Sequence, residues 1–184
     1  MFIMHKLSYL FAILFLGLSG CGSIKGFYSG YKRLSSEQTE KVVLLDNEAL
    51  IPRDKTKIYA VTANTFTKSI AELDTVIVYR WSAHCSSESC IPIYVAETYC
   101  KQNNYHLFIL ADYYDDLLFK QVGKTSNPLL AVNHKHYGTD RVNAYGNKFA
   151  KEVDQQKILN KSNNYFRFLI FKNGKLVAVK DKLK

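Results

Sequence analysis

The sequence predicts a three-layer α/β domain with a mixed central sheet and a β-hairpin near its end. From about residue 51 onward, short apolar runs alternate with helical stripes, which is typical of strands separated by helices that cover a sheet. The run Thr75–Trp81 is mostly β-branched and aromatic with almost no polar alternation, as expected of a central strand buried on both faces. Asn173-Gly174 separates two later apolar runs and is the strongest short-range hairpin signal.

The first half of the domain is predicted to begin with a β-α-β unit. Ile58–Val61 has the composition of a strand. Before the central strand, apolar side chains spaced along one helical face are Phe66, Ile70 and Leu73. After it, a second stripe with a four-residue spacing consists of Ile91, Val95 and Tyr99. Pro92 suits the first turn of that second helix, and Asn103-Asn104 predicts its end because asparagine tolerates the left-handed conformation.

The second half of the domain carries shorter signals. Strands are expected at Tyr105–Ala111 and Leu129–Val132, and a short helix at Asp115–Val122. Thr139 can cap a further helix, in which Gly146 costs about 1 kcal/mol relative to alanine. The apolar stripe of that helix consists of Val142, Tyr145, Phe149 and Val153. The two hairpin strands are expected at Phe166–Phe171 and Leu176–Val179.

The N-terminus has the layout of a signal peptide. Lys6 precedes the apolar run Leu7–Leu18, whose length of about twelve residues suits a signal-peptide core and is short for a membrane-spanning helix. The run ends in Leu18-Ser-Gly-Cys21, which resembles the lipobox of bacterial lipoproteins. That resemblance implies cleavage before Cys21 and lipidation of its thiol, palmitate included. The alternative is an uncleaved hydrophobic N-terminus with a chance cysteine.

These signals divide the chain into three parts. Residues 1–20 are predicted to be a signal peptide, residues 21–50 a lipidated N-terminus and tether, and residues 51–184 the folded domain. The resemblance to lipoproteins implies a bacterial membrane lipoprotein that faces the periplasm or the cell exterior, with the membrane as its partner through the N-terminal lipid.

Composition and charge narrow the function classes. The 184 residues are 47% hydrophobic and 14% aromatic, enough for a substantial core. The formal net charge is +9, and loss of Lys6 with the signal peptide leaves 9 − 1 = +8. The positive charges are spread along the chain without a basic helix or an aromatic-basic ladder, so nucleic acid is not an expected partner. General attraction to an anionic membrane surface is the simpler interpretation.

Three cysteines remain once Cys21 is assigned to the anchor. Outside the cytoplasm, an oxidised pair with one buried thiol is a reasonable partition of Cys85, Cys90 and Cys100. Cys85 and Cys90 lie where the central strand gives way to a helix. The positive end of a helix dipole stabilises a thiolate, so this turn is the candidate site. Cys100 falls on the apolar face of the helix, where cysteine behaves as a small hydrophobe.

Two stretches resemble the thioredoxin-like superfamily. Trp81-Ser-Ala-His-Cys85 matches that family's strand-end Trp-x-x-x-Cys, and Phe171-Lys-Asn-Gly174 matches the hairpin of its last strand pair. The resemblance covers about residues 57–180 and implies a three-layer thioredoxin-like fold with thiol-disulfide exchange as its activity. By this match Cys85 is the nucleophile and Cys90 the resolving cysteine. Trp81 and His84 shape the approach of a thiol-containing protein partner, and no cofactor or metal is required.

The sequence departs from that family in two respects. Four residues separate Cys85 from Cys90 where the family has two, and the position of the family's cis-proline, before the penultimate strand, corresponds here to Phe166. The competing interpretation is therefore a non-catalytic thioredoxin-like binding or scaffold lipoprotein, with a structural or vestigial disulfide and His84 as a solvated turn residue. A further alternative resembles the copper-delivery branch, with His134 and His136 joining the cysteines as metal ligands.

Overall fold

The computed structural model describes residues 26–159 and 167–183. Within these ranges the chain forms a seven-stranded mixed sheet with five α-helices and a short 3₁₀ helix. In chain order the elements are η1 (Tyr31–Arg33), α2 (Ser36–Glu40), β1 (Val42–Leu44), β2 (Ile58–Val61), α3 (Ala63–Ile70), β3 (Thr75–Trp81), α4 (Ile93–Gln102), β4 (His106–Ala111), α5 (Asp116–Phe119), β5 (Leu129–Val132), α6 (Val142–Val153), β6 (Phe168–Lys172) and β7 (Lys175–Lys180). The predicted α/β class with a mixed sheet is confirmed.

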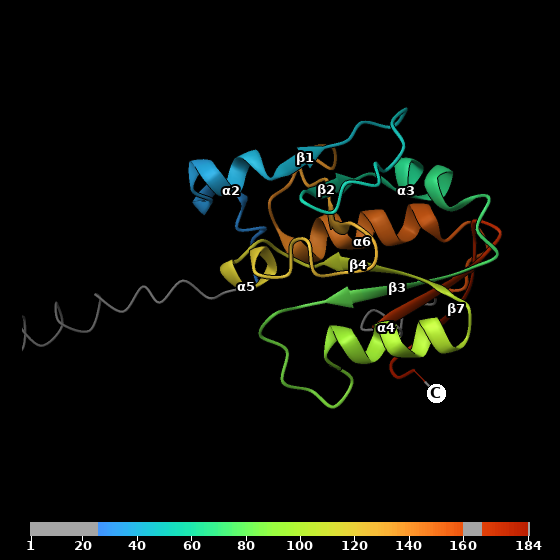
Figure 1. Ribbon diagram of the computed structural model, residues 1–184. Helices are drawn as coiled ribbons and strands as arrows, with labels where there is room; N and C mark the ends of the chain where they lie inside the picture. The colour runs from blue at the N-terminus through green and yellow to red at the C-terminus, as the bar shows by residue number, and fades with distance from the viewer. Residues whose placement is uncertain (1–25, 160–166, 184) are drawn as a thin grey trace, which may run out of the picture.

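The strands lie in the order β1-β2-β5-β4-β3-β6-β7 (Figure 1). Neighbours from β1 to β3 pair in parallel, whereas β6 pairs antiparallel with both β3 and β7. The chain crosses the sheet from β2 to β3 and then returns through β4 to β5, so its direction reverses at β3. In open α/β sheets the crevice outside the carboxyl end of such a strand is the usual position for a ligand.

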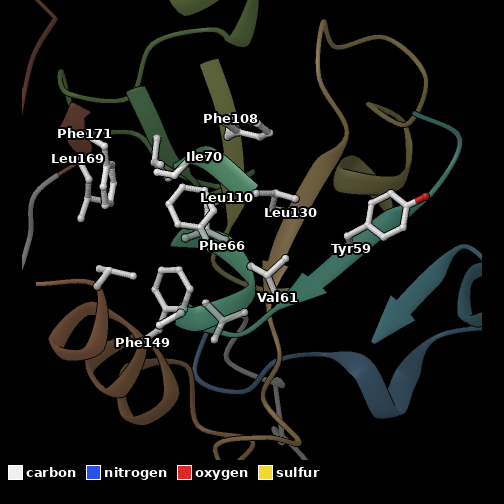
Figure 2. Close-up of a cluster of buried hydrophobic side chains, with 14 of the residues drawn as sticks. Tyr59, Val61, Phe66, Ile70, Phe108, Leu110, Leu130, Phe149, Leu169 and Phe171 are labelled. Carbon is white, nitrogen blue, oxygen red and sulfur yellow. The ribbon is translucent and has the colours of Figure 1, made fainter. Parts of the chain in front are cut away.

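Helices cover both faces of the sheet and make the domain three-layered (Figure 1). One face packs against α3 and α6, and the other packs against α4 and α5. The centre of the first face is Phe66 of α3, whose ring lies 5.4 Å from that of Phe171 and 6.1 Å from that of Phe108, both edge to face. Figure 2 shows this cluster closed by Phe149 from α6. These buried aromatic contacts fix both helices against the sheet.

Several local predictions are confirmed. The bounds of the central strand, of β2 and of β5 agree with the sequence prediction. Helix α3 buries Phe66 and Ile70 as expected, although it ends at Ile70, before Leu73. Asn104 follows α4 in the left-handed conformation, with φ 57°.

The terminal hairpin is also confirmed. Asn173 and Gly174 connect β6 to β7 with φ values of 46° and 72°, as a primed turn requires. Phe166, the predicted first residue of this hairpin, lies outside the described residues.

The N-terminal part of the described chain, from Gly26 onward, packs against the rest of the folded body. Strand β1 extends the sheet by pairing in parallel with β2, and Leu45 is buried in the core. Farther upstream, Ser29 donates its backbone N–H to the carbonyl of Asp140, and its own carbonyl accepts from the N–H of Tyr114. The sequence predicts a short ordered entry at Val42–Leu45, and β1 occupies most of that range as a three-residue edge strand that becomes stable only through its neighbours.

Two helix predictions are corrected in detail. Helix α5 spans only Asp116–Phe119, with the Asp115 carboxylate accepting from the N–H of Leu118 at its start. Helix α6 begins after Arg141 and has no side-chain cap, so Thr139 does not cap it. Instead the Thr139 hydroxyl accepts from the N–H of Arg141 in the preceding turn. Among the described helices, none is long and apolar enough to cross a membrane.

Candidate functional site

The candidate site is the loop between β3 and α4, which contains a disulfide between Cys85 and Cys90. Their Cα atoms lie 6.0 Å apart, within the normal range for a disulfide. Two turns hold the loop: the N–H of Cys85 donates to the carbonyl of Ser82, and that of Cys90 donates to the carbonyl of Ser87. The loop follows the carboxyl end of β3, where the chain reverses its direction across the sheet.

Both cysteines lie in the turn between β3 and α4, as the sequence predicts, but neither is adjacent to the start of the helix. Pro92 is the N-cap residue, and the helix begins at Ile93, three residues after Cys90 and eight after Cys85. The effect of a helix dipole falls off within one turn, so α4 contributes little to the electrostatics of Cys85. Pro92 ends the loop because proline fits the start of a helix, whereas the preceding serines favour turns.

A guanidinium group takes the place of the expected helix dipole. Nη2 of Arg167 donates to Sγ of Cys85 at 2.8 Å. Arg167 lies immediately before β6, and its carbonyl accepts from the N–H of Arg80, which extends the pairing of β6 with β3. Its Nη1 donates to the carbonyl of Arg80 at 3.2 Å. A cation in this position stabilises a thiolate at Cys85 when the disulfide is reduced.

Asp112, at the end of β4, orients the two arginines. Its Oδ1 lies 3.1 Å from Nη2 of Arg80, and its Oδ2 lies 3.8 Å from Nη1 of Arg167. The Tyr145 hydroxyl donates to the Asp112 backbone carbonyl, so α6 helps to hold this end of β4. Two cations balanced by one carboxylate leave the group with a formal charge of +1, beside the disulfide.

Ser87 provides a polar contact to both sulfur atoms. Its hydroxyl oxygen lies 3.4 Å from Sγ of Cys85 and 3.2 Å from Sγ of Cys90. The Ser89 hydroxyl lies 2.8 Å from that of Ser87. A hydroxyl between the two sulfurs can donate to whichever one carries negative charge after the disulfide opens.

The disulfide lines a cavity of about 700 Å³. The loop forms one wall, the arginines and Asp112 form another, and α6 closes the cavity with Asn143, Gly146 and Asn147. A Cβ atom added to Gly146 would approach nothing more closely than a side-chain nitrogen of Arg80 at 4.0 Å. Most of the lining residues carry polar side chains, and the volume is that of a site for a small molecule or a few residues of a peptide.

The other predicted site residues are placed differently. His84 lines the cavity, but its Nε2 lies 3.2 Å from Oδ2 of Asp115, so its ion-pair partner is this carboxylate. Trp81 is half-buried against the core on the α4 face and is not among the described residues that line the cavity. Its backbone carbonyl accepts from the N–H of Asp112 and thereby joins the ends of β3 and β4.

Cys100 and the two later histidines do not join the disulfide. Cys100 is a free thiol buried in the α4 face of the core, where burial raises its pKa to about 11. His134 packs among the rings of tyrosines, and burial lowers its pKa, whereas His136 stacks edge to face on Tyr137. In the described parts of the chain, no three His, Cys, Asp or Glu side chains are grouped to hold a metal ion.

Three residues of the site were missed by sequence reasoning: Arg167, Asp112 and Ser87. Arg167 could have been found from its spacing in the sequence before the Asn173-Gly174 turn. When the first strand of that hairpin pairs antiparallel with β3, the residue just before β6 lies close to the carboxyl end of β3. Asp112 directly follows a predicted parallel strand, and the carboxyl ends of such strands share one edge of a sheet. Ser87 carried no comparable signal.

Comparison with models of protein families, with curated proteins and with solved structures finds no match to this chain.

Proposed function

We propose that this protein is a lipid-anchored, extracytoplasmic thioredoxin-like protein that carries out thiol-disulfide exchange through Cys85 and Cys90. The observation that carries the proposal is the Arg167 guanidinium, 2.8 Å from Sγ of Cys85 beside a cavity of about 700 Å³. A disulfide that only fastens a loop needs neither a cationic neighbour nor an open cavity. A reactive disulfide benefits from both, because the cation stabilises the thiolate and the cavity admits a partner.

The position of Arg167 also bears on the resemblance to the thioredoxin-like superfamily. That family has a cis-proline just before its penultimate strand, against the cysteine pair. Here the penultimate strand is β6, and the residue immediately before it, Arg167, contacts Cys85. No cis peptide bond occurs among the described residues. In this proposal a charged side chain occupies the region where the family uses a proline, so the partner is held by polar and charged contacts.

The exchange reaction has two steps in the oxidising direction. A partner thiolate attacks Sγ of Cys85, the Cys85–Cys90 bond breaks, and its electron pair leaves on Cys90, whose sulfur is 3.2 Å from the Ser87 hydroxyl. A second partner thiolate then attacks the partner's own sulfur in the mixed disulfide and releases Cys85 as a thiolate beside Arg167. The partner is oxidised to a disulfide and the protein is reduced to a dithiol. In the reverse direction Cys90 resolves the mixed disulfide.

A trapping experiment tests this proposal. In a Cys90→Ser variant, a mixed disulfide on Cys85 cannot be resolved, so Cys85 should retain thiol-containing partners on a non-reducing gel. The matched control is the double variant Cys85→Ser/Cys90→Ser, which should retain none. Because the parent chain can resolve the intermediate, it should show only traces. Identical gels for the single and double variants, together with a disulfide that resists dithiothreitol in the folded protein, would contradict exchange activity.

The second candidate function is a non-catalytic binding or scaffold protein of the same fold and location. The observation that favours it is that both cysteines precede α4, so they lack the dipole of a helix N-terminus. The reduction potential of the Cys85–Cys90 disulfide distinguishes the two functions, since a structural disulfide has a much lower reduction potential than one that takes part in exchange. The copper-delivery alternative lacks a ligand set in the described residues.

The anchoring part of the proposal rests on Leu18-Ser-Gly-Cys21, which lies outside the described residues. The layout of a charged start, a short apolar run and small residues before a cysteine supports cleavage at Cys21 and its lipidation. An oxidising compartment is also consistent with the disulfide between Cys85 and Cys90.

A further inference from the structure

The first described residues lie at the edge of the candidate site. Gly26 lines the disulfide cavity and also a second cavity of about 420 Å³, which is bounded by the segment that leads into α2 and by α5. The two cavities share Gly26, His84 and Tyr113. The Tyr113 ring lies 3.5 Å from where a Cβ of Gly26 would stand, and its hydroxyl accepts from Ser82 in the disulfide loop. The first part of the described chain is therefore in contact with the site.

Residues 27–30, which we call the entry segment, are fixed to the domain. The carbonyl of Phe27 accepts from the N–H of Val142, and Tyr28 forms a bridge with Arg141. Gly30 has φ 78° and approaches the Tyr114 carbonyl so closely that no Cβ would fit. These contacts hold the entry segment at the carboxyl end of the sheet.

The distance from the proposed anchor is short. Gly26 follows Cys21 by 26 − 21 = 5 residues, which span at most about 17 Å when fully extended. A lipidated Cys21 therefore keeps Gly26, and with it this end of the sheet, within about 17 Å of the anchor.

The surface of this end suits an anionic membrane. Phe27 and Tyr28 are 62% and 47% exposed, and aromatic rings favour the region of lipid head groups. Exposed cations surround them: Lys32 and Arg33 of η1, Arg141 of the bridge, and Lys135 over the ring of Tyr31. Among the carboxylates nearby, Asp140 is bonded to Ser29, Asp115 lies beside His84, and the exposed Asp116 accepts from the side-chain amide of Gln38. Basic residues next to a membrane anchor attract anionic lipids.

We infer that the surface formed by the entry segment and η1 rests on an anionic lipid bilayer, with both cavities opening beside it. The inference rests on the lipidation of Cys21 proposed above, but not on the redox activity of the disulfide. It specifies the side from which a partner reaches Cys85: the partner is a molecule held at the membrane surface, because the anchor keeps the cavity next to the bilayer.

Quenching of tryptophan fluorescence by nitroxide-labelled phospholipids tests this orientation. The lipidated full-length chain is reconstituted in vesicles that contain anionic phospholipid, and the parent chain gives the baseline of its one tryptophan, Trp81. A Phe27→Trp variant should show strong additional quenching. The matched control is Leu50→Trp, at a site with 63% exposure. The next residue, Ile51, bonds to Ser69 in the last turn of α3, which places position 50 at the opposite end of the sheet. The Leu50→Trp control should show no additional quenching.

A second set of variants, which removes positive charges, distinguishes electrostatic binding to the lipid surface from simple tethering by the anchor. Replacing Lys32 and Arg33 with glutamine should reduce the quenching at position 27, whereas the same change at Arg53 and Lys55, both exposed, should not. Equal quenching at positions 27 and 50 in vesicle-bound protein would overturn the orientation and leave the anchoring intact. If the chain carries no lipid on Cys21 and does not bind the vesicles, the proposed anchoring fails and the inference fails with it.

Discussion

Removal of the Arg167 charge provides the sharpest test of the site. At a separation of 2.8 Å, two unit charges interact by about 1.5 kcal/mol even at the dielectric constant of water, about 80. That energy corresponds to about a tenfold change in the fraction of Cys85 present as thiolate at a fixed pH. The side chain of Arg167 is only 21% exposed, so the energy in the folded protein is at least this large. Arg167→Gln should therefore slow alkylation of reduced Cys85 about tenfold.

The pH dependence gives the sign of the effect. Well below the pKa of an ordinary thiol, about 8.5, the alkylation rate follows the thiolate fraction, so the parent should react faster than Arg167→Gln. At higher pH both thiols are ionised and the two rates should converge. Iodoacetamide is a suitable reagent because it is neutral and its approach is not itself steered by the arginine. Peptide mass mapping then assigns the modification to Cys85.

The control is Lys182→Gln. Lys182 lies 3.0 Å from Glu88 in the same loop, but its contact is with a carboxylate and not with sulfur. Its removal should leave the rate and the pH profile unchanged. Melting curves of both variants exclude unfolding, since loss of the Arg167 hydrogen bond to a backbone carbonyl should cost only about 1 kcal/mol. Equal alkylation rates for the parent and Arg167→Gln across the pH range would refute the assignment of Arg167 as the group that activates Cys85.

Three further predictions concern the anchor and the fold. Cys21→Ser should abolish incorporation of labelled fatty acid and release the protein from the membrane fraction; continued labelling would contradict the lipobox interpretation. Gly174→Val should lower the stability by about 1–2 kcal/mol, because the residue has φ 72° and a Cβ would stand 3.1 Å from Cα of Ala71; chemical denaturation measures this, and an unchanged midpoint would argue against the turn. Gly146→Ala should raise the stability by about 1 kcal/mol, since it removes a helix-interior glycine where a methyl group has room; a loss of stability would show that the space is not open.

The local elements could be predicted well where a short pattern carries them. Thr75–Trp81 is a mostly apolar run, and it forms a strand whose first five residues are buried. Asn173-Gly174 defines a turn by its need for positive φ at both positions. Predictions failed where the outcome depends on distant contacts. Thr139 has the chemistry of a cap, yet α6 begins later because the entry segment pairs with the residues just before it.

The candidate site was found only in part from the sequence. Cys85 and Cys90 were identified by their position after a strand, and they form a disulfide. The sequence predicted that the dipole of the following helix would activate these cysteines, and this was wrong because α4 begins beyond both residues. The side chain at Cys85 comes from Arg167, 82 residues farther along the chain, and no pattern in the sequence around Cys85 anticipates that contact.

The sequence alone determined the α/β class, the cysteine pair and the hairpin, because each depends on the composition or spacing of neighbouring residues. The tertiary structure decided which groups meet at the disulfide. Pairing of β6 against β3 brings Arg167 to Cys85, and parallel pairing of β4 with β3 brings Asp112 to both arginines. It also decided that the entry segment lies against the site. These contacts follow from the order and direction of strands in the sheet, which are set by the packing of the whole chain and not by any one segment.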